Sequence, residues 1–160
     1  MKTNLFKITV VAILLIVTAH SCKQENPAPT LPPETQEGKH TFGCYVNGRL
    51  FVPVPGAAGF GSPFLISDYY LSTNSLTIIA YGRNEYFNLS ILNPEENIKK
   101  EIEGIIYSSY RIQNTGEIIF TRFDLDNLIV SGTFSFEIKP YYSITQGRFD
   151  IKMYNYNIRE

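Results

Sequence analysis

Hydrophobic and polar residues alternate along most of the chain that follows residue 40. Within residues 133–139 every second side chain is apolar, and residues 148–153 repeat this pattern. A period of two over such lengths is typical of antiparallel strands that are buried on one side. Asn47 and Gly48 join two of these segments. They favour a tight hairpin turn, because both central positions of a type I′ turn need a positive φ.

The pattern predicts an all-β fold, a single antiparallel β-sandwich or barrel-like domain of about nine short strands over residues 41–160. The choice between sandwich and barrel stays open. Residues 94–102 depart from the alternation and are predicted as the one short helical turn, with Asn93 as its cap and Pro94 in its first position. The expected strands are residues 42–46, 49–54, 65–71, 75–81, 86–92, 104–112, 117–123, 128–139 and 144–154.

The start of the chain has the features of a secretion signal. Residues 1–7 carry two lysines and no acid, and residues 8–19 are apolar apart from two threonines. A membrane-spanning helix needs about 20 apolar residues, so this segment is too short to span and suits a signal peptide. We predict that residues 1–21 are the signal peptide, that cleavage follows Ser21 and that the Cys22 thiol is acylated. The alternative is ordinary secretion with a free Cys22.

Residues 22–40 are predicted to be the lipidated cysteine followed by a Pro-rich tether. Four prolines occur within residues 23–40, and such a composition favours an extended polyproline II spacer. The protein would then attach to a membrane through its N-terminal lipid. More than one acyl chain is needed for stable attachment, because a single chain binds only marginally.

Four motifs occur in order along the chain: LPPETQEGK (residues 31–39), TFGCYVNGRLFVP (residues 41–53), SGTFSF (residues 131–136) and GRFDIK (residues 147–152). With them the chain resembles a family of small Bacteroidota-type lipoproteins of unknown function. The resemblance implies the same lipid anchor, stalk, Asn-Gly hairpin and closing pair of C-terminal strands, and it supplies no catalytic residue. We expect a location in the cell envelope, at the outer membrane, with the side of that membrane left open.

Charge and composition argue against several activities. The chain has 14 Lys and Arg against 15 Asp and Glu, which is not the basic surface of a nucleic-acid-binding protein. Its two His and two Cys lack the spacing of a zinc or copper site. His40, at the end of the tether, would be the sole histidine of the mature chain, which disfavours Ser–His and Cys–His catalysis. We expect no catalytic residue, no metal and no cofactor, and an inert core thiol at Cys44.

Acidic residues and one loop offer weaker signals. Residues 124–127, Asp-Leu-Asp-Asn, are predicted to form a turn, with calcium binding as the alternative. Glu137 and Asp150 fall at polar positions of their strands, so we expect both to face solvent. Residues 56–61 are rich in glycine and are predicted to be a flexible connection. A hydrolytic pair of carboxylates stays open, because such pairing is spatial and leaves no sequence motif.

The chain contains 11 tyrosines, and its adjacent pairs are the candidate ligand-binding residues. These are Tyr69 with Tyr70 and Tyr141 with Tyr142. Neighbours on a strand point to opposite sides, so one ring of each pair should be exposed. Exposed tyrosines form a stacking platform for sugars or a partner surface, or simply cross-strand pairs that stabilise a sheet. The absence of Trp speaks against a sugar platform.

Four functions therefore stay open. We favour a non-catalytic envelope lipoprotein that binds an envelope protein or a surface component such as a glycan. The second is a carrier of a small apolar ligand inside a barrel or sandwich. The third is a carbohydrate-binding accessory lipoprotein, and the fourth is an enzyme that uses carboxylates or tyrosine. The oligomeric state is left open.

Overall fold

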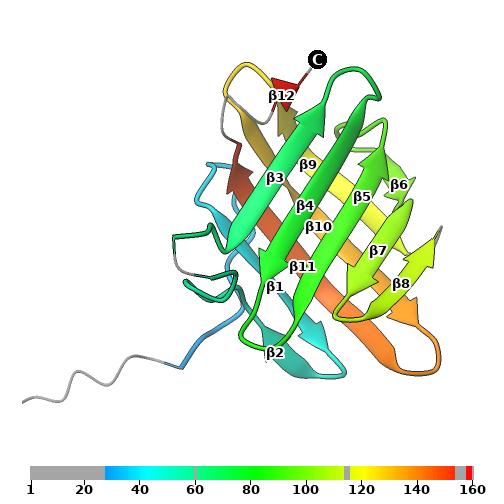
Figure 1. Ribbon diagram of the computed structural model, residues 1–160. Helices are drawn as coiled ribbons and strands as arrows, with labels where there is room; N and C mark the ends of the chain where they lie inside the picture. The colour runs from blue at the N-terminus through cyan, green and yellow to red at the C-terminus, as the bar shows by residue number, and fades with distance from the viewer. Residues whose placement is uncertain (1–27, 60, 114–115, 154–157, 160) are drawn as a thin grey trace, which may run out of the picture.

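The computed structural model describes residues 28–59, 61–113, 116–153 and 158–159. Its strands form two six-stranded sheets, here called sheet A and sheet B, that lie face to face. The green strands in front in Figure 1 belong to sheet B. Sheet A contains, in order across the sheet, β2 (Arg49–Phe51), β1 (Thr41–Val46), β11 (Tyr142–Lys152), β10 (Ile129–Ile138), β9 (Glu117–Asp124) and β6 (Lys99–Glu101). Sheet B contains β12 (Ile158–Arg159), β3 (Leu65–Tyr70), β4 (Ser75–Tyr81), β5 (Tyr86–Leu92), β7 (Gly104–Tyr107) and β8 (Tyr110–Gln113).

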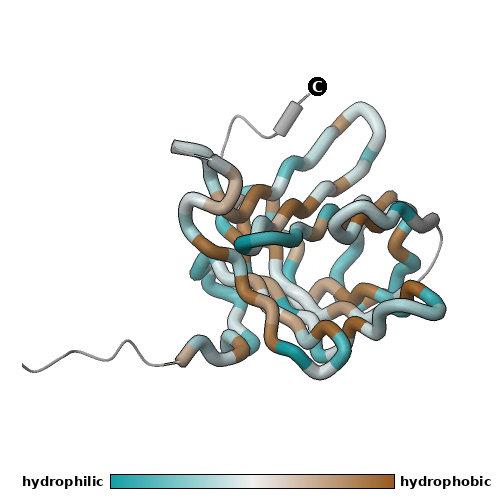
Figure 2. Tube along the Cα trace, turned by 60° about the horizontal axis from the view of Figure 1, so that its bottom comes forward, coloured by the Kyte–Doolittle hydropathy of each residue, from teal (hydrophilic) through white to brown (hydrophobic). Residues whose placement is uncertain are grey.

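The predicted all-β class is confirmed, and the architecture is the sandwich, because the two sheets form separate ladders. All pairings of neighbouring strands are antiparallel except that of β12 with β3. Hydrophobic and hydrophilic residues alternate along the strands in Figure 2. The predicted Asn-Gly turn is also confirmed, since Asn47 and Gly48 have φ values of 49° and 79°. No helix in the described part of the chain is long and apolar enough to cross a membrane.

Two predicted elements are wrong. Residues 94–102 contain no helical turn: β6 pairs with β9 instead. Both Asn93 and Asn97 have a left-handed backbone, with φ of 47° and 59°, which a right-handed helix does not accommodate. Residues 104–112 form two strands rather than one, because Ser108 has a φ of 54° and turns the chain between β7 and β8.

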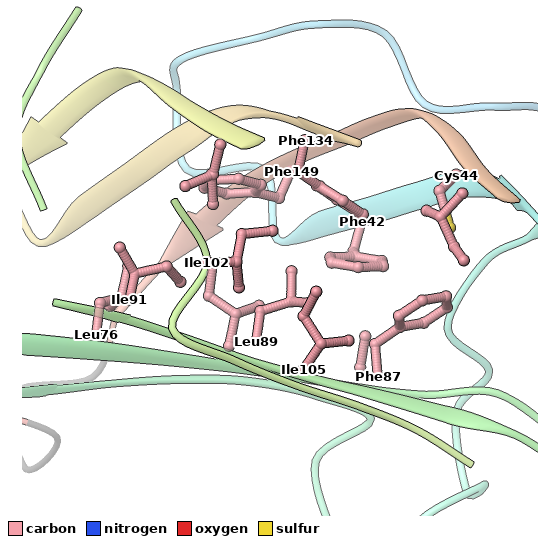
Figure 3. Packing of buried hydrophobic residues seen from close by; sticks show 14 of the residues in the cluster. Phe42, Cys44, Leu76, Phe87, Leu89, Ile91, Ile102, Ile105, Phe134 and Phe149 are labelled. Atoms are coloured by element: carbon pink, nitrogen blue, oxygen red, sulfur yellow. The ribbon is translucent and has the colours of Figure 1, made fainter. Parts of the chain in front are cut away.

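Aromatic rings fill the space between the sheets, as Figure 3 shows for Phe42, Phe87, Phe134 and Phe149. The ring of Phe42 lies 5.1 Å from that of Phe134, and the ring of Phe87 lies 5.8 Å from that of Phe42. All four side chains are at most 4% exposed. Cys44 is fully buried and free, so its predicted place in the core is confirmed.

Two phenylalanines of the core lie opposite glycines on the ladder between β10 and β11. Gly132 pairs with Phe149, and Phe134 pairs with Gly147. A Cβ atom on Gly147 would stand 2.5 Å from Phe134 Cε2, and one on Gly132 would stand 2.9 Å from Phe149 Cζ. Gly147 therefore leaves the space that the ring of Phe134 fills, and Gly132 leaves space both for the ring of Phe149 and for the Ile119 carbonyl of β9, which a Cβ atom would meet first. This reciprocal arrangement explains why SGTFSF and GRFDIK each combine glycine with phenylalanine.

Residues 31–39, here called the strap, cover part of the outer face of sheet A. In Figure 1 they belong to the blue trace that leads into β1. The Gly43 position of β1 accepts the strap closely, because a Cβ atom there would stand 2.6 Å from Pro32 Cδ. Arg148 of β11 donates to the Pro32 carbonyl at 3.3 Å, and Arg122 of β9 donates to the Gln36 carbonyl at 2.6 Å.

The strap is held above all by the carboxylate of Asp150, which is 1% exposed. Our expectation that Asp150 faces solvent is therefore wrong: it points outward from the sheet, but the strap covers it. Its oxygens accept bonds from the Thr35 hydroxyl at 2.6 Å and the Gly38 N–H at 2.7 Å. The Ser131 hydroxyl of β10 donates at 2.7 Å. The N–H groups of Glu37 and Lys39 complete the set, at 3.1 and 3.2 Å.

These bonds also set the titration of Asp150. Burial by itself would raise the pKa of Asp150, but the hydrogen bonds from Thr35, Ser131 and the strap N–H groups lower this pKa below its ordinary value. A carboxyl with a lowered folded-state pKa stabilises the fold fully above its unfolded-state pKa, which is about 4. That contribution is lost as the pH falls through the folded-state pKa.

The strap gives a first prediction. Asp150→Asn should lower the free energy of unfolding at pH 7 by about 2 kcal/mol or more, because hydrogen bonds to a charged group contribute roughly 1.5–3 kcal/mol each. The deficit relative to wild type should shrink as the pH falls below about 4, where the unfolded wild-type chain takes up a proton at Asp150 that the folded chain does not, and it should be smallest below the lowered folded-state pKa. Urea unfolding followed by tyrosine fluorescence measures both. Asp126→Asn, at an exposed turn position, is the control and should change little. A deficit that is the same at every pH would contradict the assignment.

The ladder between β10 and β11 gives a second prediction. Gly147→Ala should destabilise the protein by about 1–3 kcal/mol, because the new methyl group must displace the packed ring of Phe134. Gly104→Ala is the matched control, since a Cβ atom there would meet Ser90 Cβ at an ordinary 3.6 Å. The same urea unfolding experiment compares the two variants. Equal stability of the two variants would show that the packing of the Phe134 ring does not need a glycine at position 147.

Candidate functional site

The four candidate tyrosines lie at two opposite ends of the sandwich. Tyr69 and Tyr70 end β3, at the top of Figure 1, whereas Tyr141 and Tyr142 belong to the hairpin between β10 and β11 at its bottom. The sequence pairs therefore do not form one site. As expected for neighbours on a strand, Tyr69 points inward and is 5% exposed.

Tyr69 has a structural place. Its hydroxyl donates to Asn74 Oδ1 at 2.6 Å, and its ring lies edge-on to that of Phe123 at 5.4 Å. The hydrogen bond anchors the turn after β3, and the ring contact joins β3 of sheet B to β9 of sheet A. Tyr70 is half-buried on the outer face of sheet B.

At the other end, four tyrosines come together; we call Tyr107, Tyr110, Tyr141 and Tyr142 the tyrosine cluster. The ring of Tyr142 lies edge-on to those of Tyr107 and Tyr110, with centroids 4.8 and 5.4 Å apart. The ring of Tyr141 lies 5.2 Å from that of Tyr110, at an angle of 40°. Tyr141 is the outermost ring and is 56% exposed. The cluster thus joins the hairpin of sheet A to the β7–β8 turn of sheet B.

A groove of about 700 Å³ adjoins the cluster. It is open to solvent and lies between strand β8 of sheet B and the ends of β9 and β10 of sheet A. Its lining includes two tyrosines and four charged residues: Tyr110, Tyr141, Arg111, Lys139, Glu117 and Glu137.

Strand pairing explains why a groove opens there. The pairing of β10 with β9 ends at Ser135 and Glu117, whereas the pairing of β10 with β11 continues to Ile138 and Tyr142. The last residues of β10 therefore form a sheet edge within the described part of the chain. Strand β8 is the end strand of sheet B. Two sheet edges thus face one gap, and the tyrosine cluster closes one end of it.

Charged side chains of both signs line the groove. Lys139 Nζ lies 3.3 Å from Glu137 Oε2, and Glu117 forms an ion pair with Lys99. Arg111 stands on β8, across from these pairs. The lining contributes two basic and two acidic groups from its own residues, so it has no strong excess of either charge.

A polar trio adjoins the cluster and consists of the exposed Arg49, the half-buried Glu85 and the buried Tyr107. Glu85 accepts a hydrogen bond from Arg49 Nη2 at 2.7 Å and another from the Tyr107 hydroxyl. Burial, with the bond to Glu85, raises the pKa of Tyr107. Burial alone would raise the pKa of Glu85, but the bonds from Arg49 and Tyr107 lower it below its ordinary value. Neither Tyr107 nor Glu85 is thus poised to exchange a proton near neutral pH, so the trio acts as a fixed support for the cluster.

Other residues that drew attention in the sequence lie elsewhere. His40 is half-buried with its ring edge-on to Phe64 at 5.8 Å, and burial lowers its pKa. Burial also raises the pKa of Cys44, as befits an inert thiol. The predicted turn at Asp124 is confirmed, because its carboxylate accepts both the N–H and the side-chain amide of Asn127 at 2.8 Å.

Among the described residues, no group of three or more His, Cys, Asp or Glu side chains is arranged to hold a metal ion. Ser21 and Cys22, the predicted cleavage and lipidation positions, lie outside the described residues. The glycine-rich loop is a series of turns, in which the N–H of Ala57 donates to the Val54 carbonyl and that of Gly59 to the Gly56 carbonyl.

Sequence patterns identify only part of the groove. Tyr141 is found because it belongs to a tyrosine pair. Tyr110 and Arg111 are missed, since the alternation predicts one continuous strand over residues 104–112. The two serines at positions 108 and 109 are the signal that could have indicated a turn there, and hence the return strand β8.

Comparisons of the chain with models of protein families, with curated proteins and with solved structures gave no significant match. The site is therefore interpreted from its own geometry.

Proposed function

We propose that the protein is a non-catalytic binding protein of the cell envelope, held to the outer membrane by a lipid on Cys22. The groove beside the tyrosine cluster is its ligand-binding surface. The observation that carries this proposal is that Tyr110 and Tyr141 line an open groove of about 700 Å³, with their rings in contact with each other and that of Tyr110 also in contact with Tyr142. Sites for small ligands combine such rigid apolar surfaces with a few polar groups.

The packing of the core favours this proposal over a carrier. A carrier needs an empty apolar space between its sheets, whereas the described interior is filled by side chains that are at most 7% exposed. The Phe42, Phe87 and Phe134 rings meet in the middle of it. Binding at the surface needs no rearrangement of this core.

Attachment to the membrane rests on the sequence. The short apolar segment, the small Ser21 and the following Cys22 support a cleaved signal peptide with an acylated cysteine. After cleavage the charge of the mature chain is mildly acidic, and the lipid would provide the attachment.

The anchor is tested in the native host with the full-length chain. Wild-type protein should incorporate a radiolabelled fatty acid and enter the detergent phase on phase separation, whereas Cys22→Ser should do neither. Cys44→Ala is the control, because a buried thiol gives no access to an acyl donor, and it should behave like wild type. Recovery of unlabelled wild-type protein in the aqueous phase would refute the anchor.

The groove is tested by photo-cross-linking in living cells. A benzophenone amino acid at Lys139 places the reactive group on the rim of the groove and leaves the tyrosines intact. It should give adducts that decrease at least about fivefold when Tyr141 is changed to Ala, since the ligand loses an aromatic contact. The same probe at Leu71, which is 48% exposed at the other end of the sandwich, is the control. Equal adducts from both positions, or adducts indifferent to Tyr141, would contradict a ligand in the groove.

A further inference from the structure

Two aromatic side chains, those of Tyr110 and Tyr141, line the groove. Tyr141 is 56% exposed, and its ring is tilted by 40° against that of Tyr110. Tyr142 packs edge-on against Tyr110 and prevents that ring from turning away. A sugar ring has faces of C–H groups, which pack on an aromatic ring while the hydroxyls around its rim stay free to form hydrogen bonds. Large rigid rings give such contacts at little cost in side-chain entropy.

The polar groups of the groove suit hydroxyl groups. Arg111 supplies N–H donors, and Glu117 and Glu137 supply acceptor oxygens. Each sugar hydroxyl both donates and accepts, so it can use both kinds of group. Because the two basic and two acidic residues balance, the lining does not select a strongly charged polymer.

The shape of the groove suits part of a longer chain. Its volume of about 700 Å³ falls within the range of roughly 300–1,000 Å³ that is typical of small-ligand sites. It is an open groove between two sheets rather than an enclosed cavity. A section of a polymer can therefore lie in it while the rest continues into solvent.

An extended peptide is the main competitor, because free sheet edges can accept an added strand. The edges here carry Glu117, Glu137 and Lys139, and charged side chains are a common means by which proteins prevent strand addition at an edge. Pro140, which follows the end of β10, has no N–H to offer. The aromatic faces and the charged edges together favour stacking of a ligand over strand pairing.

Resting on the proposed function, we infer that the ligand of the groove is a neutral, extended glycan that stacks on Tyr110 and Tyr141. Arg111 and Glu137 bind its hydroxyls from opposite walls. Two tyrosine rings take the place that a single large indole occupies in other stacking sites, which answers the objection raised by the absence of Trp. We assign no side chain of the groove a role in cleaving the glycan.

Native affinity electrophoresis of the full-length protein in mild detergent tests the inference. The gels contain dextran, starch, mannan, xylan or mixed-linkage β-glucan as neutral polymers, and polygalacturonate as an anionic one. At least one neutral polymer should retard the wild-type protein. Tyr141→Ala should raise the dissociation constant about tenfold or more, whereas Tyr141→Phe, which keeps the ring, should bind nearly as wild type. Tyr70→Ala is the control and should bind like wild type.

The outcomes separate the inference from the proposed function. Retardation by polygalacturonate alone, by no polymer, or equally for Tyr141→Ala and wild type would overturn the glycan assignment. So would mass spectrometry of the Lys139 cross-link if it identified a peptide rather than hexose or pentose increments. In each of these cases a cross-link at Lys139 that depends on Tyr141 would leave the groove as a binding surface. If the cross-link at Lys139 were lost as well, both the glycan inference and the proposed binding function would be refuted.

Discussion

Two phenylalanine rings that lie over glycines hold the centre of this protein in register. The contacts of Phe134 with Gly147 and of Phe149 with Gly132 lie on the ladder between β10 and β11. A shift of the pairing register by one residue would turn every side chain of these strands to the other face of the sheet. The fit of each phenylalanine ring over its glycine therefore helps to fix which residues enter the core. Strands β1 and β9 then pair with this central ladder from its two sides.

The end of the molecule that carries the groove also depends on this ladder. Because β10 and β11 stay paired as far as Ile138 and Tyr142, their hairpin extends beyond the last pairing of β9 and carries Tyr141 out to the edge of sheet B. There it meets the β7–β8 turn, and the hydrogen bond from Tyr107 to Glu85, which also accepts from Arg49, holds the end of β7 beside that turn. The packed core thus holds Tyr110 and Tyr141 side by side at one end of the sandwich.

Sequence patterns predict those structural features that depend on residues close to one another in the sequence. Alternation identifies the strands because burial itself alternates along a pleated strand, and Asn47 with Gly48 identifies a turn through its backbone preference alone. The segment after Pro94 fails this test: its local signals favour a helix, but pairing with the edge of β9 determines its structure. The prediction that Asp150 faces solvent is wrong for a related reason. Its position correctly predicts that it points away from the core, but no local signal tells that the strap covers it. The groove likewise joins residues from three strands of two sheets, and only Tyr141 is marked in the sequence.

The strap also determines how the domain would respond to mechanical force. A pull on the chain ahead of residue 31 loads the strap before it reaches β1, because Asp150 clamps the strap to the sheet through several bonds. These bonds would rupture first and release slack before the load reaches a strand of sheet A. Under tension applied ahead of the strap, the chain would thereby lengthen by the residues of the strap while the two sheets stay folded.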